Sequence, residues 1–159
     1  MRLRSDLERK RLHGIASLTA SGSAPGAGIY SAEASALTYR RLGTAARTIL
    51  AAGFPVIVDA TFLHRAEREA FRAVAEDAGV PFLILDFHVP LDVLRERVAA
   101  RLARGDDPSE ASVEVLERQI AEREPLTPAE MAAAVSVDGT LPPGAGAWRQ
   151  ALERNLLTH

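Results

Sequence analysis

Short apolar runs alternate with longer amphipathic stretches along most of this chain. The clearest run lies in FPVIVDAT (residues 54–61), where apolar residues lead into Asp59 and Thr61. A β-branched run that follows a glycine and a proline and ends in a polar turn predicts a buried parallel strand. The run FLILDF (residues 82–87) is apolar almost throughout, which is typical of a strand covered on both faces.

The amphipathic stretches predict the helices, because their apolar residues recur at helical spacing and capping residues or glycines mark their ends. We expect helices at residues 7–12, 31–52, 64–78, 90–104, 112–123 and 147–157, and a short one beginning near Thr127. We expect strands at residues 2–5, 54–59, 82–87 and 134–138. This alternation predicts a three-layer α/β fold, with a mostly parallel sheet of about four strands and helices on both faces.

Composition narrows the class of protein. The 159 residues are 47% hydrophobic and 25% charged, which suits one globular domain over residues 1–159. A net charge of −2 argues against broad electrostatic binding to nucleic acid. The lack of cysteine excludes disulfides and thiolate metal sites. No apolar run approaches the about 20 residues of a membrane helix, and the first residues lack a signal-peptide core, so we expect no membrane partner and a cytoplasmic location.

Two acids follow predicted strands. Asp59 ends one strand and Asp6 comes directly after another. In open α/β sheets, ligands bind outside the carboxyl ends of the strands, so both carboxylates should face one crevice. Asp59 followed by the hydroxyl of Thr61 suits a hydrated Mg²⁺, while Asp6 could serve as a general base. The alternative is that each acid only caps the following helix.

Arginine supplies 18 of the 19 basic residues. Three arginines share one side of the predicted helix at residues 90–104, namely Arg97, Arg101 and Arg104. Because this line runs into a Gly-Asp-Asp-Pro turn, it suggests a lid that clamps phosphates. The alternative is a solvated face whose arginines pair with Glu96 and Glu110.

A glycine-rich segment, SGSAPGAG (residues 21–28), invites comparison with a phosphate-binding loop. Such a loop needs a preceding strand and then GxxxxGK[ST] at the start of a helix. Neither Gly22 nor Gly28 is followed by that lysine, and the only lysine, Lys10, lies in ERKRL. We therefore interpret residues 21–28 as a flexible surface segment.

Several segments together resemble a known family. They are RSDLERKRLHG, GAGIYSAEA, TYRRL, AGFPVIVDATFLHRAERE, VPFLILDFHVPLDVLRERVAARLARGDD and SEASVEVLERQ, and they cover almost the entire chain. The chain is similar to the ATP-binding P-loop kinases of the zeta-toxin and polynucleotide-kinase type. Relatives in this group are AAA-family ATPases, often fused behind an aminoglycoside-phosphotransferase-like domain.

The resemblance implies an ATP-dependent phosphotransferase that uses Mg²⁺ and a small-molecule or nucleotide acceptor. By resemblance, Asp6 accepts the proton of the acceptor hydroxyl, and Asp59, beside Thr61, holds Mg²⁺ through water. The arginines of the implied lid, which contact phosphates, are Arg97, Arg101 and Arg104. The resemblance also places Arg4 and residues 28–31 near the acceptor.

The chain departs from that family at one point, because the first strand and the GxxxxGK[ST] loop do not precede RSD. Phosphoryl transfer depends on that loop, so we expect the chain to be inactive or impaired unless a partner chain or domain supplies it. Two alternatives stay open: a non-catalytic module that binds nucleotides, anions or a partner, and a metal-dependent hydrolase using Asp6 and Asp59.

The missing strand is central in the family's strand order. Its absence leaves a space of roughly 10 Å between the strands at residues 54–59 and 82–87. We therefore expect either that these two strands close up and pair directly or that the sheet stays interrupted, with apolar edges that could pair with another chain.

Overall fold

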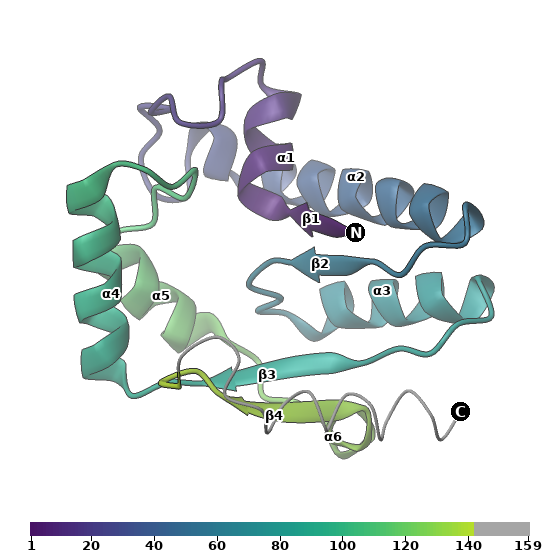
Figure 1. Cartoon of the computed structure of the whole chain (residues 1–159). Coiled ribbons are helices and arrows are strands. Elements are labelled where there is room, and N and C mark those ends of the chain that lie inside the picture. Colours follow the sequence, from purple (N-terminus) through teal and green to yellow (C-terminus); the bar gives the residue numbers. More distant parts are fainter. Residues whose placement is uncertain (142–159) are drawn as a thin grey trace.

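The computed structural model describes residues 1–141 (Figure 1). Its strands are β1 (Arg2–Arg4), β2 (Ile57–Asp59), β3 (Ile84–His88) and β4 (Ala134–Asp138). Its helices are α1 (Ser5–Leu12), α2 (Ala32–Ala51), α3 (Arg65–Asp77), α4 (Leu91–Arg104), α5 (Val113–Glu122) and α6 (Pro128–Ala132), with a 3₁₀ turn η1 (Gly28–Tyr30). The helix expected at residues 147–157 lies outside the described part.

The four strands form two separate parallel pairs, β1 with β2 and β3 with β4. In Figure 1 all four arrows point the same way, and β2 and β3 lie between β1 and β4. The predicted α/β class with parallel strands is therefore confirmed. Of the two outcomes expected for the sheet, the interrupted one is found, since β2 and β3 share no ladder.

Several predicted helix starts are confirmed by their caps. The side chain of Ser31 accepts from the Ala34 N–H at 3.2 Å, and that of Ser112 accepts from the Val115 N–H at 3.3 Å. Thr127 opens α6 with a capping box.

The alternative interpretation, in which Asp6 and Asp59 only cap the helices that follow them, is wrong. Arg4 occupies the N-cap position of α1, so Asp6 lies within its first turn. α3 begins only at Arg65, after the N-cap residue His64, which leaves Asp59 too far upstream to cap that helix.

The core lies between α2, α3 and the first strand pair. Leu42 and Ala46 of α2 pack with Phe71 and Val74 of α3, and residues of both strand regions complete the cluster. These partly buried neighbours are Leu3, Tyr39, Leu50, Val56, Val58, Phe62 and Phe82. Val58 precedes Asp59 directly, so the core fixes the end of β2 and the position of that carboxylate.

The expectation that β2 and β3 are fully covered is wrong in part. Ile57 and Phe87 are each 58% exposed, although both lie within strands of apolar sequence. The reason is the interruption of the sheet, because among residues 1–141 neither strand pairs with a second neighbour that could shield these side chains.

Candidate active site

Asp6 and Asp59 come together at the carboxyl ends of β1 and β2, as predicted from their positions after strands. The parallel register aligns Arg4 with Asp59. The Arg4 guanidinium lies between the two acids, with Nη2 at 4.0 Å from Asp6 Oδ2 and Nε at 3.7 Å from Asp59 Oδ2. Arg2 also forms an ion pair with Asp59. One arginine therefore bridges the two carboxylates that the sequence singled out.

A third carboxylate joins from the loop between α4 and α5. Arg4 Nη2 donates to both oxygens of Asp107, at 3.1 and 3.2 Å. The Ser109 N–H also donates to Asp107 Oδ1 at 2.9 Å, which fixes the carboxylate in its turn. Sequence reasoning placed residues 105–108 in a turn but did not assign Asp107 to the site, because only folding brings this loop to β1.

We call Arg4, Asp6, Asp59, Arg101 and Asp107 the Arg4 cluster. Burial raises the pKa of Asp6 above its ordinary value, although the nearby charges of Arg4 and Arg9 act in the opposite direction. Burial also disfavours the ionised form of Asp107, but hydrogen bonds from Ser109 and Arg4 outweigh it and lower the pKa of that carboxyl. Asp6 and Asp107 therefore differ in pKa, and Asp6 accepts a proton more readily than Asp107.

Arg101 is the predicted lid arginine that reaches this cluster. Its charge contributes to the electrostatics of both Asp6 and Asp107, and its Nη2 donates to the Ala111 carbonyl at 2.9 Å. Its Nε is buried and has no hydrogen-bond partner among the described residues. Arg101 as a whole is half-buried, and a guanidinium that keeps a free donor is suited to bind an anion.

The other two lid arginines lie elsewhere on α4. Arg97 Nη1 donates to the Gly139 carbonyl at 2.7 Å, beyond the end of β4. Arg104 pairs with Asp106 at 3.2 Å in the adjacent turn. Both side chains are exposed. Sharing one side of α4 with Arg101 therefore does not bring them into the Arg4 cluster. The alternative pairing with Glu110 is wrong, because that carboxylate binds Lys10.

Lys10 is buried and fully engaged. Its Nζ lies 2.7 Å from Glu110 Oε1 and donates to the carbonyls of Ser17 and Thr19 at 3.1 and 2.9 Å. The backbone N–H and hydroxyl of Ser21 bind the same carboxylate at 3.0 and 2.7 Å. The start of the glycine-rich segment is therefore anchored to the α4–α5 loop, and the expectation of a flexible surface segment is wrong for Ser21.

The turn after Asp59 has an unusual backbone conformation. Phe62 has φ of 45°, in the left-handed region that bulky residues avoid. Its N–H donates to the Tyr39 hydroxyl at 3.2 Å, and its carbonyl accepts from Arg68 Nη1 at 3.1 Å. Thr61 is exposed. Burial raises the pKa of the Tyr39 hydroxyl to about 12. These contacts hold the segment that follows Asp59 in one conformation.

The donor set around Asp59 fits one form of Mg²⁺ binding. The Asp59 side chain is 43% exposed, so water and phosphate oxygens have access to it. Among residues 1–141, no group of three or more His, Cys, Asp or Glu side chains is placed to hold a metal ion. Asp59 would therefore supply one carboxylate, with water and phosphate oxygens as the remaining ligands, a pattern common for Mg²⁺.

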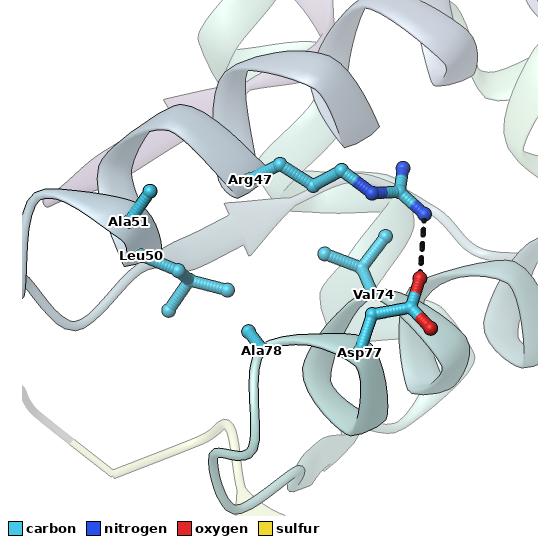
Figure 2. A pocket seen from close by; sticks show the side chains of 6 residues that line it. All are labelled: Arg47, Leu50, Ala51, Val74, Asp77 and Ala78. Carbon is cyan, nitrogen blue, oxygen red and sulfur yellow. Dashed lines mark hydrogen bonds and ion pairs between the residues drawn. The ribbon is translucent and has the colours of Figure 1, made fainter.

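A separate hollow of about 180 Å³ lies between α2 and α3 (Figure 2). Its lining residues are Arg47, Leu50, Ala51, Val74, Asp77 and Ala78, and Arg47 pairs with Asp77 at 3.2 Å across it. These residues lie near the carboxyl ends of the two helices, whereas the Arg4 cluster lies at the carboxyl ends of the strands. The hollow is therefore distinct from the candidate site.

Comparison with known proteins identifies a family. A family model described as AAA domain matches residues 1–126, which is most of the chain and includes every residue of the Arg4 cluster. No curated protein and no solved structure matches the chain. In the described part of the chain, no helix is long and apolar enough to cross a membrane.

Proposed function

This chain belongs to the AAA domain family, and we propose that it is an ATP-dependent phosphotransferase acting on a small-molecule or nucleotide acceptor. The family makes it a nucleotide-binding domain of the P-loop kinase-like type. The observation that carries the proposal is the bridge from Arg4 to Asp6 and Asp59 at the carboxyl ends of two parallel strands. That edge is where open α/β sheets bind their ligands.

Asp6 is proposed as the general base. Its pKa is raised by burial, which brings a carboxylate closer to the range in which it accepts protons efficiently. In the proposed step, Asp6 takes the proton from the acceptor hydroxyl. The acceptor oxygen then bonds to the terminal phosphorus of ATP, and the bond to the bridging oxygen breaks to release ADP.

Asp59 is proposed to hold Mg²⁺ through water, with Thr61 close by. When bound, Mg²⁺ neutralises charge on the phosphates during transfer. Arg2 and Arg4 orient the Asp59 carboxylate, but they also neutralise part of its charge. We therefore expect Asp59 to bind Mg²⁺ together with ATP rather than the bare ion.

Arg101 is proposed to contact the transferring phosphate through its buried Nε, which has no hydrogen-bond partner in the described part of the chain. Arg104 and Arg97 lie on the same helix, and we propose that they contact phosphates after leaving Asp106 and the Gly139 carbonyl. Such an exchange would replace weak surface contacts by charge-assisted bonds to phosphate.

The phosphate loop is proposed to come from another segment or a partner chain. Residues 1–159 contain no GxxxxGK[ST] sequence, and Lys10 is committed to Glu110. We therefore expect this polypeptide alone to transfer phosphate slowly or not at all. The engagement of Asp59 by two arginines also favours a second candidate function, a non-catalytic module that binds nucleotides or other anions at Arg101.

Calorimetric titration of the chain with ATP and Mg²⁺ tests the proposal. We expect binding that weakens at least tenfold in Asp59→Ala and stays unchanged in Asp77→Ala, a matched surface acid that pairs with Arg47. Asp6→Asn should keep that binding. If Asp59→Ala binds ATP as well as the wild type, the role of Asp59 is wrong, and the non-catalytic candidate is favoured.

A further inference from the structure

A buried carboxylate of α1 joins two exposed arginines that come from different helices. The side chain of Glu8 is only 7% exposed. One of its oxygens pairs with Arg11, one turn further along α1, and the other lies 3.7 Å from Nε of Arg41 on α2. Both arginines nevertheless reach solvent, since the side chains of Arg11 and Arg41 are 69% and 55% exposed. We call these three residues the Glu8 group.

The Glu8 group stands on a rigid support. α1 packs against α2 (Figure 1), and Leu42, which follows Arg41, is fully buried. A free arginine side chain carries about 2 kcal/mol of rotamer entropy, much of which is lost when it binds a ligand. An ion pair with a buried carboxylate removes part of that freedom beforehand, so Arg11 and Arg41 are partly preorganised.

The two guanidinium groups keep most of their donors for a ligand. Each has five N–H bonds, and among residues 1–141 both have Glu8 as their ion-pair partner. Because Arg11 Nη1 and Arg41 Nε contact the same carboxylate, these nitrogens lie within roughly 8 Å of each other. Two donors that bind different oxygens of one phosphate are also at most about 8 Å apart.

The charge of the surrounding chain favours an anion. Residues 1–51 carry eight Arg or Lys and three Asp or Glu, whereas the remaining residues carry 11 and 18. Of the three acids, Glu8 is shared by the two arginines, Asp6 belongs to the Arg4 cluster, and Glu33 lies about two turns before Arg41 on α2. The part of the chain that holds the Glu8 group is therefore positive although the whole protein is not.

We propose that Arg11 and Arg41 form a binding site for a phosphate group, separate from the Arg4 cluster. Glu8 cancels one of the two positive charges, so the ligand needs more than a single negative charge to be held firmly. A phosphate dianion meets this requirement, and its oxygens can accept N–H groups from both guanidinium groups at once. The ligand is inorganic phosphate or a phosphomonoester, which share this chemistry.

NMR of the arginine Nε–Hε groups tests the proposal, with inorganic phosphate as the probe at fixed pH and ionic strength. The signals of Arg11 and Arg41 should shift along one saturable curve. The control is Arg95, an exposed arginine of α4 that pairs with Glu117 at 2.8 Å, and its signal should not follow that curve. Equal shifts without saturation at all three would mean an adventitious ion only and would overturn the proposal. Acetate shifting the signals as strongly as phosphate would also contradict it.

Two neighbouring variants separate a specific site from general attraction. Arg41→Gln should weaken phosphate binding at least fivefold, because it removes one of the two guanidinium groups. Arg40→Gln removes the same charge from the adjacent exposed position and should change binding less than twofold, because it alters only a screened potential. If both variants weaken binding equally, net charge and not a site attracts the ion, and the proposal is wrong.

The proposal does not rest on the proposed phosphoryl transfer, and Arg101→Met distinguishes the two. Phosphate should shift Arg11 and Arg41 as before in this variant, whether or not ATP binding is lost. Loss of the Arg11 and Arg41 shifts would place the phosphate at the candidate active site and overturn the proposal.

A peptide with one phosphoserine identifies the source of the phosphate. Binding at least tenfold tighter than that of inorganic phosphate would support a phosphorylated polypeptide, and equal binding would support a small phosphorylated molecule. The same peptide with glutamate in place of phosphoserine should bind at least tenfold more weakly than the phosphopeptide. Equal binding of these two peptides would contradict a phosphate site.

Discussion

The buried ion pair between Arg68 of α3 and Glu130 of α6 offers the sharpest test of how this fold is held together. Arg68 Nε lies 2.6 Å from Glu130 Oε1, and each side chain is only 5% exposed. The same guanidinium donates to four carbonyls, those of Phe62, Leu63, Glu124 and Pro125. It therefore ties α3 to the turn after Asp59 and to the segment before α6.

We expect Arg68→Met to be strongly destabilising. The substitution keeps an apolar side chain of similar length but leaves Glu130 buried without its cation. Removing one partner of a buried pair costs about 3–5 kcal/mol, because the remaining charge stays desolvated. Chemical unfolding at pH 7 measures this as a lower free energy of unfolding. A loss below about 1 kcal/mol would refute the reasoning.

The pH dependence of the unfolding free energy gives an independent value for the contribution of the Arg68–Glu130 pair. The hydrogen bond from Arg68 lowers the pKa of Glu130 from an ordinary 4.5 to about 2, despite the opposing effect of burial. A depression of this size corresponds to about 3 kcal/mol. Because the folded pKa is the lower one, this stabilisation is present above pH 4.5 and is lost as the pH falls toward 2.

Glu130→Gln isolates this contribution from that of the other acids. Unfolding free energies of the wild type and this variant, measured between pH 6 and 2, should differ by an amount that shrinks by about 3 kcal/mol across the range. If the difference between the two proteins does not change with pH, the Glu130 carboxyl has no lowered pKa, and Arg68 does not stabilise its charge.

Three further perturbations test other contacts. Arg4→Met should raise the pKa of Asp6 still further, because the charge of Arg4 is the largest of those that oppose the effect of burial on this carboxyl. Carbon NMR titration measures the pKa of Asp6. An unchanged pKa would contradict the bridge from Arg4 to Asp6. Lys10→Met should cost about 2 kcal/mol in unfolding free energy, since Glu110 and two carbonyls lose their buried partner; a neutral result would contradict this anchoring role. Tyr39→Phe should lower the free energy of unfolding by about 1 kcal/mol, because the hydroxyl that accepts the Phe62 N–H is lost while the ring stays packed. Chemical unfolding measures this loss, with Leu37→Ala, at an exposed position of α2, as the control.

Local signals in the sequence were enough to identify most elements. Helix starts at Ser31, Ser112 and Thr127 were predictable because capping is a contact between residues three apart. The position of Asp6 and Asp59 after strands predicted their proximity, because parallel strands end at the same edge of a sheet. The prediction of the caps depends on chain neighbours alone, and the prediction that Asp6 and Asp59 lie close together depends on the fold class alone.

The candidate site contains contacts that local signals do not encode. Asp107 lies about a hundred residues from Arg4 in the chain, and nothing in a Gly-Asp-Asp-Pro turn indicates which cation it meets. The spacing of Arg97, Arg101 and Arg104 placed them on one side of a helix but did not determine which reaches Asp6. The orientation of α4 against its neighbours decides that.

The α/β class, the parallel strands and the acids at their ends were predictable before folding is considered, because periodicity and capping act over a few residues. Tertiary structure alone decided that Arg4 bridges Asp6 and Asp59, and that Lys10 is buried against Glu110. It also decided how the sheet is divided, because strand pairing depends on which backbone edges meet in space rather than on the residues within either strand.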